Sequence, residues 1–359
     1  MAETSNRKTY HEQTYIDNTL RLREILKTLP PFAKDYFRAI EPTTSTKTRI
    51  SYAYDIRIFF QFLISQNPSL AKIGIPNLNV SVLDQLKPID IEEYMEYLKL
   101  YDSPNDQTTI TNGERGLKRK ISSLRSFYTY YYKRQAIETN PVQLVDMPKI
   151  HDKAIIRLDA GETAALLDYI EHCGDQLTGQ RKAYYEKTKL RDLAIVTLLL
   201  GTGIRVSECV GLDVEDIDFR NNGIRLIRKG GSEMVVYFGP EVEKALKDYL
   251  EARKAISPLE GHEHALFYST QRKRIGVQAV ENLVKKYARA ITTTKKITPH
   301  KLRSTYGTTL YQETGDIYLV ADVLGHKDVN TTKKHYAAMD DARRRKAATA
   351  IRLREDYED

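Results

Sequence analysis

The stretch RDLAIVTLLLGTGIRVSECVGL, residues 191–212, decides how the second half of this sequence folds. Its first part is apolar enough for a buried helix, and glycines at 201 and 203 interrupt it. We expect a turn at these glycines and a new helix that begins near Arg205. Glu208 follows one helical turn later, so its carboxylate either orients the Arg205 guanidinium or forms a purely structural salt bridge with it.

A β-hairpin is expected after this turn. In NGIRLIRKGGSEMVVYFGPE, residues 222–241, apolar and polar residues alternate on both sides of Gly230 and Gly231, a pair typical of tight hairpins. Lys229 is at the tip, where its flexible stem can bring a proton donor into a site, although most turn lysines are simply solvated. The pattern predicts further helices at 240–255, 276–292, 298–313 and 316–324, and a last one from about 331.

The first half of the chain is predicted to be helical throughout. Apolar residues recur at helical spacing in 14–29, 46–64 and 116–134. The last of these helices is expected to turn its apolar residues inward and to leave its basic residues for solvent or for phosphate, namely Arg119, Lys120, Arg125, Lys133 and Arg134. For any single one of them, a solvated helix face explains the charge as well as a contact with a DNA backbone.

A linker is expected between the two halves. Residues 138–153, ETNPVQLVDMPKIHDK, contain two prolines and no sustained apolar period. The next helix is predicted after Asp159, because Asp159 and Glu162 have the spacing of a capping box. Residues 172–189 are polar, and we interpret them as a mobile excursion before the buried helix.

Composition favours a nucleic-acid partner without requiring one. The 359 residues predict two domains, and the formal net charge of +8 suits a polyanion. Two cysteines are too few for a disulfide framework or a thiolate zinc site, and we interpret His262 and His264 as part of a solvated loop. Since no apolar run is long enough to span a bilayer and no signal peptide is recognisable, we expect a cytoplasmic protein with no membrane partner.

Two segments carry residues suited to phosphate chemistry. In TPHKLRSTYG, residues 298–307, His300 and Arg303 share one face at a helix start, where partial positive charge favours an anion. Together with Arg205, a second guanidinium would hold a phosphodiester and neutralise its pentacovalent transition state.

The segment LGHKDVNTTKKHYAAM, residues 324–339, offers a nucleophile. Gly325 is expected to end a helix, His326 to follow at the turn, and Tyr336 to lie on the next helix. A phenolate near cations attacks phosphorus readily, and a phosphotyrosine bond stores the energy of the broken linkage. Such a site needs no metal, ATP or other cofactor, and the sequence contains neither a P-loop nor a carboxylate cluster for two-metal chemistry.

These pieces, in this order, resemble the tyrosine recombinase (phage integrase) family. The matching motifs are TGIRVSE, RKGG, HKLR, LGH and Tyr336 itself, and the resemblance extends over residues 45–340. It implies a mainly α fold with a small β-hairpin or sheet, in which a helical SAM-like core-binding domain precedes an α+β catalytic domain. The implied limits are an N-terminal helical extension at 1–45, the DNA-binding core-binding domain at 46–147, a linker at 148–158, the catalytic domain at 159–340 and a C-terminal tail at 341–359. The tail is either exchanged between protomers or a plain solvated helix.

The resemblance also assigns roles. Arg205 and Arg303 would clamp the scissile phosphate, with Glu208 supporting Arg205. His300 would act as general base and later as acid, and Lys229 would protonate the leaving 5′ oxygen. His326 would bond or position the phosphate, and Tyr336 would form the 3′-phosphotyrosine. Arg119, Lys120 and Arg125 would bind DNA.

Two features depart from the family pattern. Lys229 stands in a Lys-Gly-Gly-Ser turn, where the family more often has Gly-Lys-Gly, so the lysine is matched by its place in the hairpin and not by the turn sequence. His335 is a rival nucleophile beside Tyr336, but it would not give a durable phosphodiester intermediate of this kind.

Size and layout resemble the single-chain Xer recombinases of the XerS type. This implies resolution of chromosome dimers by a homotetramer on two double-stranded DNA duplexes, at a site with inverted repeats, with a DNA translocase as one candidate activator. Three alternatives remain: an integrase of a phage or transposon, a type IB topoisomerase that acts as a monomer, and a DNA-binding protein without catalytic activity.

Overall fold

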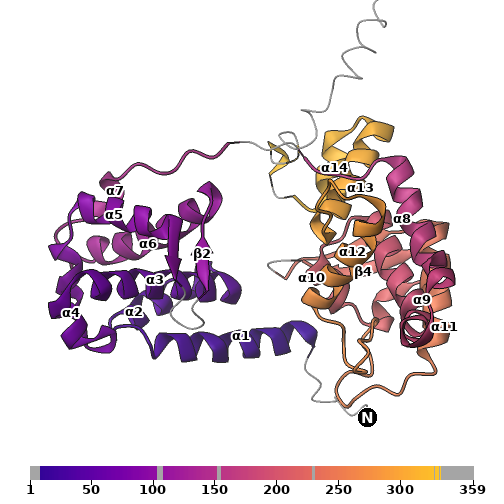
Figure 1. Ribbon diagram of the computed structural model, residues 1–359, viewed down its shortest axis with the longest axis horizontal. Coiled ribbons are helices and arrows are strands. Elements are labelled where there is room, and N and C mark those ends of the chain that lie inside the picture. Colours follow the sequence, from indigo (N-terminus) through magenta and orange to yellow (C-terminus); the bar gives the residue numbers. More distant parts are fainter. Residues whose placement is uncertain are drawn as a thin grey trace, which may run out of the picture. The chain divides into compact units, whose positions relative to one another are not determined.

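The structure, a computed structural model, describes residues 9–102, 108–151, 155–228, 231–326, 328–330 and 332. It divides into two compact units, Met1–Asp152 and Lys153–Asp359 (Figure 1). This division does not test the limits expected for the N-terminal extension, the linker and the C-terminal tail, which stay predictions. In the described part of the chain, no helix is both long and apolar enough to cross a membrane.

The first unit is almost entirely helical. Its elements are α1 (Tyr10–Leu26), α2 (Ala33–Ala39), η1 (Glu41–Thr43), α3 (Thr46–Gln66), α4 (Pro68–Ile73), η2 (Ile75–Asn77), η3 (Val80–Gln85), α5 (Pro88–Lys99), β1 (Leu100–Asp102), β2 (Thr109–Thr111), α6 (Glu114–Lys133) and α7 (Pro141–Leu144). The short strands β1 and β2 pair antiparallel and were not predicted.

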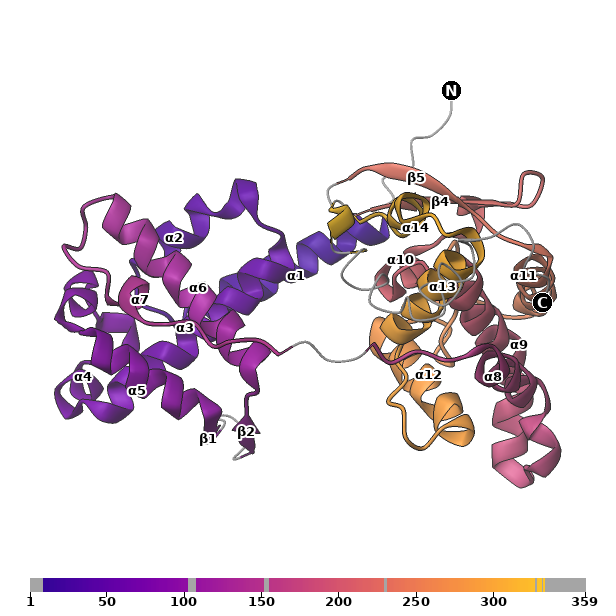
Figure 2. The same ribbon diagram turned by 90° about the horizontal axis from the view of Figure 1, so that it is seen from above.

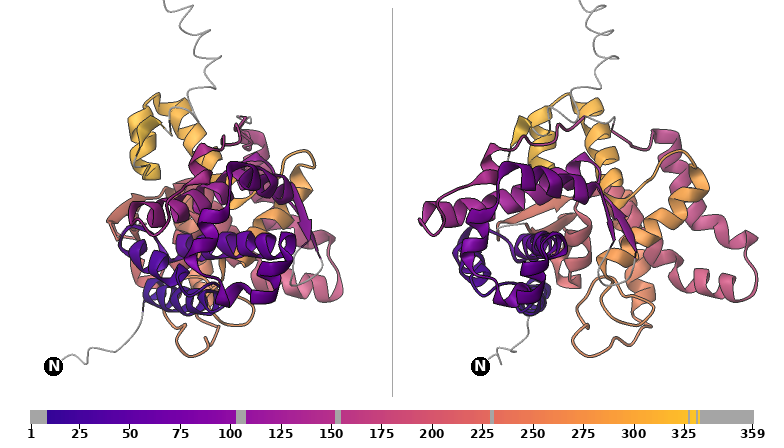
Figure 3. Two further views of the ribbon diagram at one scale, coloured as in Figure 1. Left: turned by 90° about the vertical axis from the view of Figure 1, so that its left-hand side faces the viewer. Right: turned by 60° about the vertical axis from the view of Figure 1, so that its left-hand side comes forward.

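One core organises this unit. Side chains at helical spacing on α3 and α6 meet in it, and Leu22 and Ile25 of α1 belong to the same core. Helix α1 lies along α3 (Figures 1 and 2). Figure 3 shows the helices of this unit from two further directions. The segment 138–153 is not linker throughout, because Val142 and Val145 are also buried in this core.

The second unit combines helices with a three-stranded antiparallel sheet of order β3-β4-β5. Its elements are α8 (Ala160–His172), η4 (Cys173–Gln176), α9 (Gly179–Thr202), α10 (Val206–Gly211), η5 (Val214–Asp216), β3 (Ile217–Asp218), β4 (Gly223–Ile227), β5 (Glu233–Tyr237), α11 (Pro240–Arg253), α12 (Val277–Ile291), α13 (Pro299–Thr314) and α14 (Ile317–Leu324).

Two local predictions for this unit are confirmed and one is wrong. The capping box of Asp159 and Glu162 starts α8, and β4 and β5 form the predicted hairpin, which is visible in Figure 2. Residues 172–189 are not an excursion, because α9 already begins at Gly179. The buried Tyr185 holds this part of α9 in place by donating its hydroxyl to the Ile170 carbonyl at 2.9 Å.

Candidate active site

The turn between α9 and α10 places the first arginine. Gly203 ends α9 in the left-handed conformation with φ 63°, and a Cβ at this position would overlap the ring of Tyr306. Arg205 is the N-cap of α10. The Glu208 carboxylate accepts from the backbone N–H of Arg205 at 2.7 Å and from its Nη1 at 2.8 Å, so the guanidinium is held in one orientation.

Helix α13 places the second arginine close to the first. Arg303 is 4% exposed and donates Nη1 to the Gly203 carbonyl and Nη2 to the Leu324 carbonyl. It therefore ties the α9–α10 turn to the end of α14. His300 lies on the first turn of the same helix and is exposed.

The end of α14 is where the arginines converge. Gly325 terminates this helix in the left-handed conformation, as predicted. Three arginines from three elements donate to three consecutive carbonyl groups: Arg228 to Val323 at 2.7 Å, Arg303 to Leu324, and Arg205 to Gly325 at 3.3 Å. We call the segment Val323–Gly325 the carbonyl turn.

His326 directly follows the carbonyl turn and is held by two contacts. Its backbone N–H donates to the Ala321 carbonyl at 2.9 Å, and its Nδ1 lies 2.7 Å from the Thr332 hydroxyl. One ring nitrogen is thus engaged within the chain. The structure brings His326 to the same turn as Arg205 and Arg303, although about 120 residues separate it from Arg205 in the sequence.

Two predicted site residues lie outside the described residues. These are Lys229 and Tyr336, and the tail at 341–359 lies outside them as well. Their assigned roles stay predictions.

Sequence reasoning missed Arg228, which lies among the site residues. Ile224 and Leu226 of β4 are buried, and Arg228 continues this alternation with 8% exposure. Burial lowers the pKa of Arg228 and the nearby charge of Arg205 lowers it further, while Glu208 and Asp322 act in the opposite direction. The two-residue period was the signal that could have placed this side chain inward.

The predicted DNA-binding residues of α6 require a correction. Lys120 does not face solvent: its side chain is 7% exposed and donates to the buried Asp55 at 3.2 Å. Arg119 is half exposed, and both its terminal nitrogens bond the same carboxylate. Arg125 donates within the first unit, to the carbonyl groups of Val142 and Val145. The buried carboxylate and the α7 segment attract these cations because a buried charge needs a partner.

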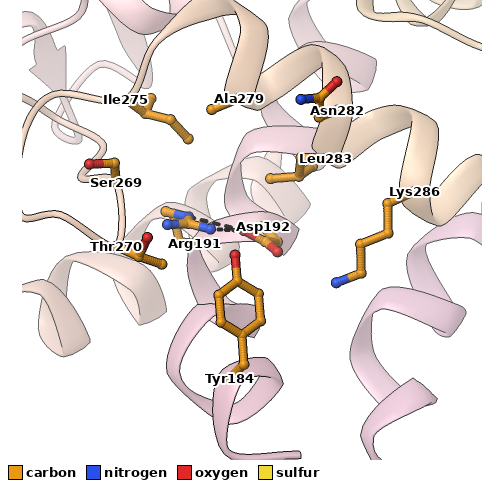
Figure 4. Close-up of a pocket in the computed structure, with 10 residues that line it drawn as sticks. All are labelled: Tyr184, Arg191, Asp192, Ser269, Thr270, Ile275, Ala279, Asn282, Leu283 and Lys286. Carbon is orange, nitrogen blue, oxygen red and sulfur yellow. Dashed lines mark hydrogen bonds and ion pairs between the residues drawn. The ribbon is translucent and has the colours of Figure 1, made fainter. Parts of the chain in front are cut away.

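A cavity of about 440 Å³ in the second unit is separate from the arginine cluster. Its lining side chains come from α9, α12 and the connection before α12, and include Arg191, Asp192 and Lys286 (Figure 4). Arg191 bonds Asp192 at 2.7 Å, and Tyr287 donates to the same carboxylate at 2.9 Å. Arg191 is thus paired with a carboxylate, and Lys286 lies over the rings of Tyr184 and Tyr287. We therefore regard the arginine cluster as the better candidate for an anion site.

The comparisons with known proteins identify the family of the chain. Residues 157–343 match the model of the phage integrase family. The chain is 33% identical over 342 residues to tyrosine recombinase XerC of Caldanaerobacter subterraneus subsp. tengcongensis, covering 91% of this chain and 88% of XerC. It is 30% identical over 333 residues to tyrosine recombinase XerS of Streptococcus equi subsp. zooepidemicus, covering 87% of this chain and 93% of XerS.

Solved structures confirm the fold. The XerH site-specific recombinase bound to its palindromic difH substrate matches with a TM-score of 0.60 and 19% identity, over 85% of this chain and 79% of XerH. A fragment of the Tn1549 transposon integrase, its residues 82–397, bound to transposon right end DNA matches with a TM-score of 0.60 and 22% identity, over 88% of this chain and 98% of the fragment. The chain belongs to the phage integrase family, the tyrosine recombinases, and is an enzyme that cuts and rejoins DNA.

Proposed function

We propose that this tyrosine recombinase acts at a specific DNA site and resolves chromosome dimers. The observation that supports a phosphate site most strongly is the meeting of Arg205, Arg303 and His326 at the carbonyl turn. The relatives named XerC and XerS support the Xer-type role.

The proposed mechanism assigns one step to each group. Arg205 and Arg303 bind the scissile phosphate and offset the charge that grows on its oxygens. His300 takes the phenol proton, and the Tyr336 oxygen forms a bond to phosphorus while the bond from phosphorus to the 5′ oxygen breaks. Lys229 gives its proton to that oxygen, which leaves as a 5′ hydroxyl. Rejoining reverses these steps with the 5′ hydroxyl of another strand as the nucleophile.

Further parts of the proposal concern assembly. We expect double-stranded DNA with inverted repeats as the partner, bound by a homotetramer on two duplexes, with activation by a DNA translocase. Arg119 remains a candidate DNA contact, since half of its side chain is exposed.

An integrase of a mobile element is the second candidate. The similarity to the Tn1549 transposon integrase over 88% of this chain favours it, and the site residues would be the same. The two candidates differ in the DNA that they cut.

Trapping of covalent adducts tests the proposal and separates the candidates. Sheared genomic DNA of the source organism is incubated with the protein, denatured with detergent, and the DNA bound to protein is sequenced. We expect adducts at one chromosomal locus and none with Tyr336→Phe. Adducts at the ends of a mobile element would support the integrase, and adducts that persist in Tyr336→Phe would refute Tyr336 as the nucleophile.

A plasmid relaxation assay tests a third possibility, a topoisomerase of type IB. A recombinase needs synapsis of two sites. Relaxation of a plasmid that lacks any recombination site, by one protein molecule per plasmid, would overturn the recombinase proposal in favour of a topoisomerase.

A further inference from the structure

Arg228 closes the base of the hairpin turn. Its backbone N–H donates to the Ser232 carbonyl at 2.9 Å, and its carbonyl accepts from the Gly231 N–H at 3.0 Å. The following residue in the chain is Lys229, the proposed general acid. The backbone of Arg228, directly before Lys229 in the sequence, is therefore held by two hydrogen bonds at the end of the hairpin.

The side chain of Arg228 reaches away from the hairpin to the carbonyl turn. Its Nη2 donates to the Val323 carbonyl at 2.7 Å. Its guanidinium lies against Gly325, where an added Cβ would overlap it. Gly325 is thus needed twice, once for its positive φ of 59° and once for the space that Arg228 fills.

This arrangement is costly for folding. The guanidinium is buried, and among the described residues neither its Nε nor its Nη1 has a hydrogen-bond partner. Burying a charge without full hydrogen bonding is unfavourable, and an apolar side chain would suit the inward position after Ile224 and Leu226 better. Local rules are broken in this way chiefly where function requires it.

The carbonyl turn is also where the phosphate-binding arginines are held. Arg205 and Arg303 donate to its second and third carbonyl groups, so Arg228 joins the hairpin to the same short segment. A link between these two parts would fix the hairpin relative to the phosphate that the arginines bind. Without it, the hairpin would be oriented by the pairing of β4 with β3 and β5 and by the burial of Ile224 and Leu226.

We propose that Arg228 is a positioning residue that ties the β4–β5 hairpin to the carbonyl turn and thereby places Lys229 to protonate the leaving 5′ oxygen. This inference rests on the proposed function, because it presupposes that Lys229 is the acid. It adds a residue that never touches DNA but acts through its neighbour in the chain.

DNA with a sulfur atom in place of the bridging 5′ oxygen tests the inference. A thiol is far more acidic than an alcohol, with a pKa of about 8.5 in cysteine, so a thiolate leaves without an acid. We expect Arg228→Met to slow single-turnover cleavage of ordinary DNA by about 100-fold, the lower end of what a general acid contributes. On the sulfur substrate we expect less than about a tenth of that effect, because no acid is needed there.

Matched variants make the result specific. Arg225→Met removes an exposed arginine from the same strand, where it pairs with Asp216, and should cleave both substrates like the wild type. Arg228→Lys keeps a donor for the Val323 carbonyl and should recover part of the rate on ordinary DNA. DNA binding should be unchanged in all three variants.

Lys229→Ala separates failure of this inference from failure of the proposed function. If Lys229→Ala slows both substrates equally, Lys229 is not the acid and the proposed mechanism fails. If Lys229→Ala is rescued by sulfur but Arg228→Met is not, the positioning role of Arg228 is overturned. Should Arg228→Met not fold, the ratio of the two rates in Arg228→Lys and Arg228→Gln decides between the same two outcomes.

Discussion

The Asp55 cluster of the first unit and the arginine cluster at the carbonyl turn of the second both hold cations, but they balance the charge differently. In the first unit Arg119 and Lys120 share the carboxylate of Asp55, which cancels much of their charge. In the second unit, the bonds described for Arg228 and Arg303 end on backbone carbonyl groups. A carbonyl oxygen satisfies an N–H group and leaves the positive charge in place. We therefore expect the first cluster to serve folding and, in line with the proposed function, the arginines at the carbonyl turn to bind an anion.

Removing Asp55 should give the largest effect. Asp55→Ala leaves Lys120 buried without its carboxylate, so we expect the free energy of unfolding of the first unit to fall by about 3–5 kcal/mol. Urea unfolding followed by circular dichroism measures this change. Asp35→Ala, which removes an exposed partner of Arg38, is the control and should change stability by less than about 1 kcal/mol. Equal effects of the two variants would contradict a structural role for Asp55.

Removing Arg205 should reduce DNA cleavage rather than stability. Arg205→Ala takes away a partly exposed guanidinium from the proposed phosphate site, so we expect adduct formation to fall by about 10²–10³-fold, or 2.7–4 kcal/mol. Duplex binding should change little, because backbone contacts elsewhere supply most of the affinity. Single-turnover cleavage and a binding titration at the same salt concentration test this. Equal loss of binding and cleavage would assign Arg205 a structural role.

A smaller effect is expected for Arg119, which pairs with Asp55 and is also a candidate DNA contact. Arg119→Gln should lower the free energy of unfolding by about 0.2–1 kcal/mol, because Arg119 is half exposed and Lys120 remains on Asp55. A DNA titration at low salt tests its second role. Weaker binding than for Lys133→Gln on the same helix would support Arg119 as a DNA contact, and unchanged binding would remove it from the DNA interface.

A further prediction concerns pH and applies only under alkaline conditions. Burial raises the pKa of the Cys209 thiol from 9.0 to about 12, so the thiol of the unfolded chain ionises first. The stability that this shift contributes is complete below about pH 9 and is lost as the pH rises toward 12. Cys209→Ala should remove this part of the pH dependence of unfolding. An unfolding curve whose pH dependence is the same with and without Cys209 would contradict it.

The same thiols distinguish the two units. Both cysteines of the chain, Cys173 and Cys209, lie in the second unit and are buried. Their alkylation rate at pH 8 therefore reports opening of the second unit alone. Asp55→Ala should leave this rate unchanged, and faster alkylation would show that the units unfold together.

Elements with a clear period were predicted well from the sequence. The β4–β5 hairpin has partly alternating strands on both sides of a glycine pair, and the helix after Asp159 carries its own capping pair. The motif residues around Arg205 and Arg303 were found because each stands beside a recognisable turn or cap. Such local signals survive in a single sequence, since neighbouring residues determine them.

Burial of charged residues was not predictable in the same way. The inward position of Lys120 depends on Asp55, which is 65 residues away, and no periodicity reveals that pairing. In the same manner, the charge of Arg228 argued for the surface although its register in β4 argued for the interior. The prediction of a mobile excursion at residues 172–189 was wrong because the helix there buries a tyrosine and a threonine among polar neighbours, which weakens the apolar period.

The carbonyl turn is recognised through its main chain, and this has a consequence for how the protein tolerates sequence change. Exchange of one side chain for another within Val323–Gly325 leaves the carbonyl groups in place, as long as the helix end and the space at Gly325 are kept. Insertion or deletion of a single residue displaces the carbonyl groups and breaks their hydrogen bonds with all three arginines. Natural variation in this segment should therefore consist of substitutions at constant length, and laboratory evolution should find length changes here lethal to activity.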